Sequence, residues 1–246
     1  MNHPLTRRRF FFYAGAAALM MSTNRLFSPP AFGQATTIAS NVTQSSFTIE
    51  SPDFGRVKAL NLGHGQFTGT RARFNEGLQW WQSDNRWHYM VARNPKLVGG
   101  EGYWVTLPGS EFTFQDNTPY RISFDLDFEQ EILYSFQMAE ADRVIMSLDL
   151  SSIPMYAWEW HDPPSIEPQI QLYANSGFQY AELLVKHFVL TNSDGSIFYE
   201  DMFDRVRWEF GMAMKGGMVK AEANGMRIYA PPNGGIDVFR RLNAAS

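Results

Sequence analysis

The chain has 246 residues, of which 44% are hydrophobic, 15% aromatic and none cysteine, and its formal net charge is −4. This composition excludes a disordered chain, because there is enough apolar material to build a core. It also excludes disulfides, thiolate metal sites and a cysteine nucleophile. The weak negative charge leaves no basic footprint, so nucleic acid is not an expected partner.

The first 35 residues have the organisation of an export signal. A basic segment, Thr6–Phe10, precedes an apolar run over Phe10–Met21. That run is too short for a membrane span, which needs about 20 residues, so we expect no stable membrane anchor. Thr6–Phe10 reads TRRRF and resembles the twin-arginine (Tat) signal. The resemblance implies export of an already folded protein to the periplasm or the cell exterior; an ordinary Sec signal is the alternative.

The small residues at Gly33–Ala35 place the predicted cleavage site just before Thr36. The leader holds four of the 21 basic residues and none of the 25 acidic ones, so the remainder carries a net charge of −8. Such a protein suits neutral or cationic partners better than polyanions. We expect a flexible arm over residues 36–46 and a single domain over 47–246. Within it, 199–246 is either an appendage or the part that completes the fold.

Most of the domain has the pattern of β-strands. In Tyr120–Phe128, apolar residues alternate with polar or charged ones, as in a strand with one buried face. Asp194-Gly195 and Asn224-Gly225 are typical of tight turns between strands. Further strands are predicted at 144–150, 169–173, 181–190 and 218–230.

One segment fits a helix better. Tyr199, Met202, Phe203, Val206 and Phe210 recur at spacings of three and four residues, which predicts a short amphipathic helix. A loop followed by a strand is the alternative. Many short strands, turn signals between them and at most one short helix near the C-terminus predict an all-β, mainly antiparallel, jelly-roll-like β-sandwich.

Tryptophan and tyrosine gather in two polar stretches, residues 79–89 and 156–162, with a further tryptophan after a glycine-rich segment. Flat rings stack on the C–H faces of sugars, while polar neighbours bind the hydroxyl groups. Burial of these rings as core anchors is the alternative. The candidate carbohydrate-binding residues are Trp80, Trp81, Trp87, Trp104, Tyr156, Trp158 and Trp160.

An acidic row extends the strand that begins at Tyr120. Asp125, Asp127 and Glu129 would point the same way, and such a cluster needs solvent, a cation or a catalytic role. The segment DLDFE resembles the strand motif of laminarinase-type (family 16) glycoside hydrolases, although the family has Glu at its first position. This resemblance implies a nucleophile at Asp125 and an acid/base at Glu129. Glu159, in the second aromatic stretch, is a further candidate carboxylate. A solvated polar face is the alternative.

No cofactor is predicted. Oxygen-rich turns such as Asn192–Ser196 offer ligands for a structural calcium ion, but no loop has the spacing of a recognised calcium motif. The oligomeric state is not determined by the sequence.

The order of features over roughly half the chain resembles jelly-roll carbohydrate-binding modules of families 4 and 9, or galactose-binding-like modules. The features are the early tryptophan stretch, the strand YRISF at Tyr120–Phe124 and the apolar strand at 181–190. The resemblance implies glycan binding without catalysis, as an accessory to exopolysaccharide or cell-wall glycan handling. The alternatives are a glycan-cleaving enzyme (a glycoside hydrolase or polysaccharide lyase) and a structural envelope protein whose aromatic residues all lie in the core.

Overall fold

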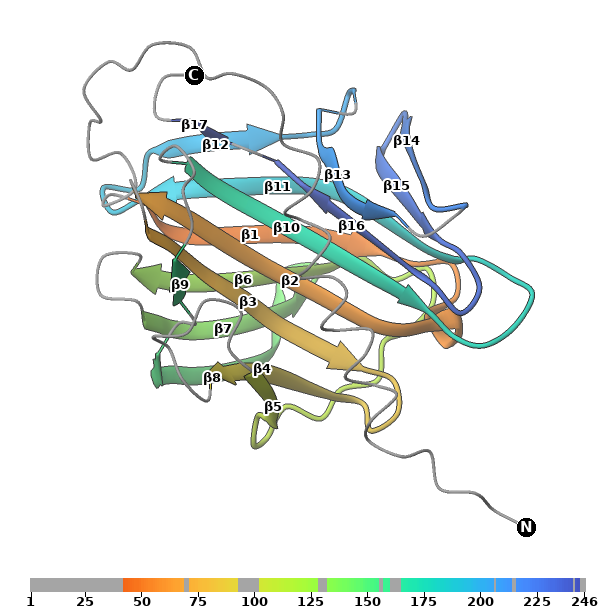
Figure 1. Ribbon diagram of the computed structural model, residues 1–246, viewed down its shortest axis with the longest axis horizontal. Helices are drawn as coiled ribbons and strands as arrows, with labels where there is room; N and C mark the ends of the chain where they lie inside the picture. The colour runs from red at the N-terminus through yellow and green to blue at the C-terminus, as the bar shows by residue number, and fades with distance from the viewer. Residues whose placement is uncertain are drawn as a thin grey trace. The chain divides into compact units, whose positions relative to one another are not determined.

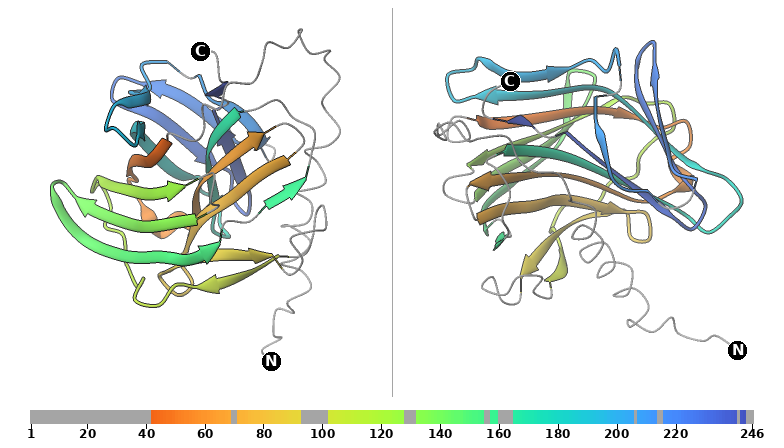
Figure 2. Two further views of the ribbon diagram at one scale, coloured as in Figure 1. Left: turned by 90° about the vertical axis from the view of Figure 1, so that its left-hand side faces the viewer. Right: turned by 45° about the horizontal axis from the view of Figure 1, so that its top comes forward.

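Two antiparallel β-sheets pack face to face in the computed structural model, as predicted (Figure 1). In the view of Figure 1 one sheet lies in front of the other, and Figure 2 shows the same two layers from two further sides. The all-β, antiparallel, jelly-roll-like fold is therefore confirmed. The structure describes residues 42–68, 71–92, 102–127, 132–154, 157–159, 165–205, 207–213, 216–240 and 242–243.

The first sheet has eight strands. They are β1 (Val42–Glu50), β6 (Tyr120–Asp127), β7 (Ile132–Glu140), β8 (Arg143–Pro154), β11 (Ala181–Asn192), β12 (Ile197–Asp201), β14 (Met218–Glu222) and β15 (Gly225–Ala230). Their order is β14-β15-β11-β1-β6-β7-β8, with β12 also paired to β11. The first strand of the domain thus lies between two strands that are distant from it in sequence.

The second sheet has nine strands. They are β2 (Val57–Thr68), β3 (Arg71–Trp81), β4 (Arg86–Ala92), β5 (Gly102–Thr106), β9 (Ala157–Glu159), β10 (Ser165–Ala174), β13 (Glu209–Ala213), β16 (Gly235–Phe239) and β17 (Leu242–Asn243). Their order is β13-β16-β10-β2-β3-β4-β5, while β17 pairs with β10 and β9 with β3. A 3₁₀ turn, Phe54–Arg56, precedes β2.

The core lies between the sheets and follows the predicted alternation. On β6, Ile122, Phe124 and Leu126 are buried, whereas Arg121, which directly precedes them, is exposed. Aromatic rings fill much of the space; the rings of Phe54 and Phe114, for example, stack with centroids 4.4 Å apart. Because each ring buries a large apolar area, this core can stabilise the domain without disulfides.

The helix expected over Tyr199–Phe210 is wrong. The segment forms the end of β12, a bend and the start of β13. Phe203, in the bend, has a φ of 58°, in the left-handed region that does not continue a helix. Buried Asp201 holds the bend, accepting hydrogen bonds from the Phe203 amide (2.7 Å) and the Trp208 indole (3.2 Å). Phe203 is buried but Met202, one residue before it, is 60% exposed, so the helical spacing does not correspond to one buried face.

One expectation about the domain boundaries also needs correction. β1 begins at Val42, so the last five residues of the expected arm 36–46 belong to a strand in the middle of the eight-stranded sheet. For residues 199–246 an appendage and completion of the fold were both considered; β15 pairs with β11 and β16 pairs with β10, which is the second alternative. The segment completes both sheets. Among the described residues, no helix has the length and apolarity of a membrane span.

Candidate functional site

A line of polar side chains crosses the outer face of the nine-stranded sheet, the face turned away from the core. Each residue in the line is the registered partner of the next, from β16 through β10, β2, β3 and β4 to β5. Their strand neighbours, such as Leu60 and Leu172, point into the core, so the line itself faces outward. We call this set the polar row: Asp237, Gln171, Asn61, Gln79, His88 and Thr106.

Two aromatic residues lie beside the polar row, two positions further along their strands. Tyr173 on β10 and Trp81 on β3 are the registered partners of Ala59 on β2, which lies between them. The indole Nε1 of Trp81 donates to Gln79 Oε1 (2.9 Å), and the hydroxyl of Tyr173 donates to Gln171 Oε1 (3.4 Å). The same Gln-x-aromatic unit therefore occurs on two strands, separated by two strand spacings, or about 10 Å.

A glycine explains how Tyr173 is oriented. Gly235 on β16 is its registered partner on the side away from Ala59. A Cβ atom at residue 235 would lie only 2.6 Å from Cδ1 and 2.8 Å from Cε1 of the Tyr173 ring. No side chain tolerates that approach, so the ring lies directly over the glycine, where only a hydrogen can fit. The Tyr173 ring can therefore take this position beside the polar row only because residue 235 is glycine.

Asn61 lies at the centre of the polar row. It is only 3% exposed, and its Nδ2 donates to Gln171 Oε1 (3.1 Å). Its Oδ1, however, has no hydrogen-bond partner within the part of the chain that the structure describes. A buried acceptor without a donor costs about 1–3 kcal/mol. This atom is therefore a natural contact point for an O–H or N–H group of a ligand.

The polar row ends in a carboxylate on β16. Asp237 is 3% exposed and accepts a hydrogen bond from Gln169 Nε2 (2.8 Å), a residue two positions before Gln171 on β10. The amide thus orients the carboxylate on the same face as the rest of the row.

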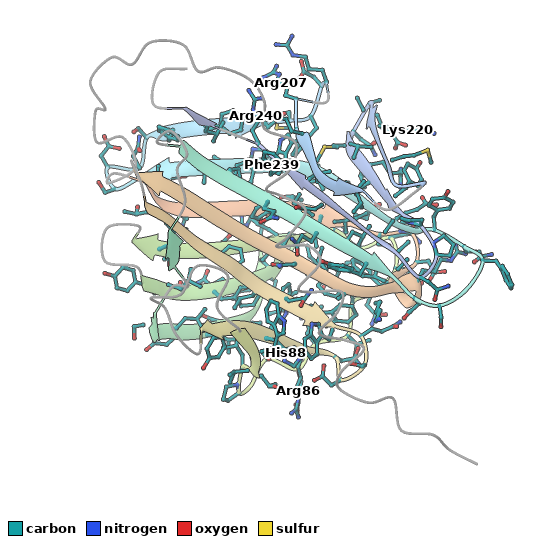
Figure 3. The ribbon with its side chains drawn as sticks, in the orientation of Figure 1. Arg86, His88, Arg207, Lys220, Phe239 and Arg240 are labelled. Atoms are coloured by element: carbon teal, nitrogen blue, oxygen red, sulfur yellow. The ribbon has the colours of Figure 1, made fainter. Side chains whose placement is uncertain are left out.

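A histidine cluster occupies the other end of the row. The Nε2 atom of His88 lies 3.1 Å from Asp84 Oδ2, and its Nδ1 lies 3.2 Å from Thr106 Oγ1. The imidazole stacks on the Trp81 ring, with centroids 3.9 Å apart and an angle of 23° between the planes. Trp104 meets Trp81 edge-on at 6.1 Å. Figure 3 shows His88 beside the ends of β3 and β4, on the strand that also carries Arg86.

The structure separates the predicted tryptophans. Trp81 and Trp104 come together on the outer face of the nine-stranded sheet. Trp80 and Trp87 point into the core and are 2% and 0% exposed, so the expectation that they stack on a sugar is not supported and they serve as core anchors. Trp158 lies in β9, but its side chain is outside the described part of the chain. The remaining two candidates, Tyr156 and Trp160, also lie outside the described residues.

The acidic row lies on the other sheet. Asp125 on β6 accepts hydrogen bonds from Gln44 Nε2 (2.9 Å) on β1 and from the Ser135 hydroxyl on β7, so both carboxylate oxygens have a donor. The side chains of Asp127, at the end of β6, and Glu159, in β9, fall outside the described part, as does Glu129 altogether. The described residues therefore show Asp125 as a hydrogen-bonded surface carboxylate, with no second acid from this row beside it.

The turn considered for calcium satisfies its own polar groups. Asp194 Oδ1 accepts hydrogen bonds from the Ser196 hydroxyl (2.6 Å) and the Ser196 amide (2.9 Å). These bonds hold the pKa of Asp194 below its ordinary value, because they favour the charged form. Among the described residues, no group of three or more His, Asp or Glu side chains is placed to hold a metal ion.

Several residues of this face were not singled out by the sequence: Asn61, Thr106, Gln169, Gln171, Tyr173 and Asp237. Part of the signal was present, because Gln169, Gln171 and Tyr173 alternate with apolar residues on a predicted strand. Amides and an aromatic ring on the outward positions differ from the charges usual on a solvated face.

Comparisons with known proteins assign no family. No protein-family model matches the chain, and no curated protein matches it in sequence. Among solved structures, it is similar to SCP-B, a member of the eqolisin family of peptidases, in a complex with the tripeptide Ala-Ile-His. The TM-score is 0.33 and the identity 10%, over 79% of this chain and 94% of that chain. So distant a likeness transfers neither an activity nor site residues.

Proposed function

We propose that this protein binds carbohydrate without catalysis, through the outer face of the nine-stranded sheet. The observation that carries the proposal is the polar row with Tyr173 and Trp81 beside it. At its centre lies Asn61 Oδ1, which has no hydrogen-bond partner among the described residues. A sugar offers both of the groups that this surface would contact: hydroxyls for the amides and C–H faces for the rings.

The chemistry of the row favours hydroxyl groups over ions. A side-chain amide both donates and accepts hydrogen bonds, as a hydroxyl does. The Oε1 atoms of Gln171 and Gln79 already accept from neighbouring side chains, so the acceptor that a sugar hydroxyl would meet is Asn61 Oδ1. The charge of −8 outside the leader also disfavours a polyanionic ligand. A neutral or cationic glycan is therefore the ligand class that the surface supports best.

The spacing of the aromatic pair suits a chain rather than a single sugar. Tyr173 and Trp81 are separated by two strand spacings, about 10 Å. Two rings at that separation would stack on alternate units of an extended oligosaccharide, while Asn61 contacts the unit between them. Affinity should therefore rise with chain length until both rings are covered.

The proposed location is the periplasm or the cell exterior, reached through the Tat route. The segment TRRRF before a short apolar run supports this part of the proposal. A core without disulfides is compatible with folding before export, because cytoplasmic folding does not favour disulfides. In this setting the protein would act as an accessory to exopolysaccharide or cell-wall glycan handling.

A glycan array followed by calorimetric titration of the best oligosaccharide tests the proposal. We expect Trp81→Ala and Tyr173→Ala each to weaken binding by about tenfold, because stacking on one ring contributes on the order of 1–3 kcal/mol. Tyr134→Ala is the matched control, since Tyr134 is 39% exposed on β7 of the other sheet. Its affinity should equal that of the unmodified chain.

Reducing-sugar release, measured in the same samples, tests the absence of catalysis. We expect no release above background from the unmodified chain or from Asp125→Asn. Folded protein that binds no glycan would refute the carbohydrate proposal and favour a structural role. Binding accompanied by cleavage would refute only its non-catalytic part.

A further inference from the structure

The contacts of His88 determine where its proton lies. A carboxylate is an acceptor only, so Asp84 at 3.1 Å requires a hydrogen on Nε2. In the neutral ring Nδ1 is then an acceptor, and the Thr106 hydroxyl, 3.2 Å away, donates to it. The neutral state is therefore an Asp84–His88–Thr106 chain in which every hydrogen-bonding atom of the imidazole has a partner.

Few charges surround this ring. On β3 it faces Gln79 and Trp81, and on β5 it faces Thr106, none of which carries a charge. The turn between β3 and β4 contributes Asp84. On β4 itself, the Arg86 guanidinium forms an ion pair with Glu111. Among the described residues, Asp84 is thus the charged side chain that these contacts place on the imidazole.

A second proton on His88 would strengthen two of its contacts. The pair with Asp84 becomes a charge-assisted hydrogen bond, which is stronger than the neutral one. The imidazolium, stacked 3.9 Å from the Trp81 ring, gains a cation–π attraction. The Thr106 hydroxyl rotates so that its oxygen accepts a hydrogen bond from Nδ1–H. Its own hydrogen stays on the oxygen and points away from the imidazole. The cation–π attraction holds the Trp81 ring more firmly against His88 on β4, and the Asp84 and Thr106 contacts hold the imidazole itself.

We propose that His88 is a positioning residue for Trp81 and that its protonation tightens ligand binding at the aromatic pair. This inference rests on the proposed carbohydrate-binding function of the same face. A ring that is already held in place loses less freedom when a ligand stacks on it, so a more firmly held Trp81 binds more tightly. Affinity is therefore higher when His88 carries a second proton than when its ring is neutral.

Calorimetric titration of the oligosaccharide selected by the array, at pH 5 and pH 8, tests this proposal. We expect about two- to fivefold tighter binding at pH 5, the size of one cation–π contact. His88→Phe keeps a flat ring against Trp81 but cannot take up a proton, so its affinity should be equal at the two pH values. His187→Gln is the control: His187 also lies 2.9 Å from a carboxylate, Glu200, but on the other sheet, and the variant should keep the full pH dependence.

Two outcomes would overturn the proposal: equal affinity of the unmodified chain at both pH values, or an unchanged pH dependence in His88→Phe. Either would leave the carbohydrate-binding function intact. If no glycan binds at any pH, the proposed function fails and with it the link between His88 and binding. The positioning role is then decided by the Trp81 indole N–H resonance, which should move between pH 5 and 8 in the unmodified chain and not in His88→Phe. A resonance that does not move overturns it.

Discussion

The two outer faces of the sandwich differ in how their polar groups are satisfied. On the eight-stranded sheet, charges meet each other: Lys186 Nζ lies 2.5 Å from Glu50 Oε2, and Arg227 Nε lies 2.8 Å from Glu222 Oε1. On the nine-stranded sheet, three of the six residues of the polar row are amides, and the acceptor of the central one, Asn61, has no partner among the described residues. On the first face these charged side chains pair with one another. On the second, Asn61 Oδ1 can still accept a hydrogen bond.

This difference distinguishes a face whose polar groups are satisfied without a ligand from a face whose polar groups a ligand could satisfy. Ion pairs at a partly exposed surface contribute little to stability and satisfy each other without a ligand. A buried amide oxygen without a donor is instead a cost that a bound hydroxyl can remove. The surface with fewer charges is therefore the better candidate for binding, although the acidic row on the other sheet is more conspicuous in the sequence.

The largest expected effect distinguishes the core from the outer face on one strand. Trp80 and Trp81 are neighbours on β3 that point to opposite sides. Trp80→Ala should lower the free energy of unfolding by about 3–5 kcal/mol, because it leaves a large cavity between the sheets. Trp81→Ala should lower the free energy of unfolding by markedly less. Urea denaturation of both variants measures this, and equal losses would mean that the outer face is packed like the core.

An intermediate effect is expected at Gly235, where the aromatic pair depends on a missing side chain. Gly235→Ala places a Cβ within 2.6 Å of the Tyr173 ring, so the ring must move. We expect a loss of about 1–3 kcal/mol in unfolding free energy and weaker glycan binding. Gly177→Ala is the control, because a Cβ there meets nothing within 4 Å. Unchanged binding by Gly235→Ala would show that the position of Tyr173 is not used.

The smallest effect is expected on the ion-paired face. The hydrogen bond from Arg227 holds the pKa of Glu222 below its ordinary value of 4.5. A lowered carboxyl pKa stabilises the fold above the ordinary pKa, and this contribution is lost as the pH falls through the folded-state value. Glu222→Gln should therefore be less stable than the unmodified chain at pH 7, by at most about 0.5 kcal/mol because the pair is partly exposed, and the difference should be smaller at pH 3. Denaturation at both pH values checks this, and a constant difference would contradict it.

Local patterns were enough to predict much of the fold. The alternation over Tyr120–Phe128 gave β6 and its buried face, because a strand turns successive side chains to opposite sides whatever lies next to it. The Asp194-Gly195 turn joins β11 and β12 as predicted, since Gly195 adopts a φ of 83° that few other residues tolerate. The spacing in Tyr199–Phe210 misled, because Asp201 and the bend at Phe203 override a helical pattern.

The candidate site depended on contacts that no local pattern contains. Asn61 and Gln171 are hydrogen-bonded across 110 residues of sequence, and only the pairing of β2 with β10 brings them together. Likewise, alternation shows that Trp80 and Trp81 face opposite sides, but not which of them is buried. The sequence by itself determined the all-β class and the periodicity of the strands, because these follow from neighbouring residues. Only the tertiary structure decided which face carries the polar row, because strand order and register arise from packing between segments far apart in the chain.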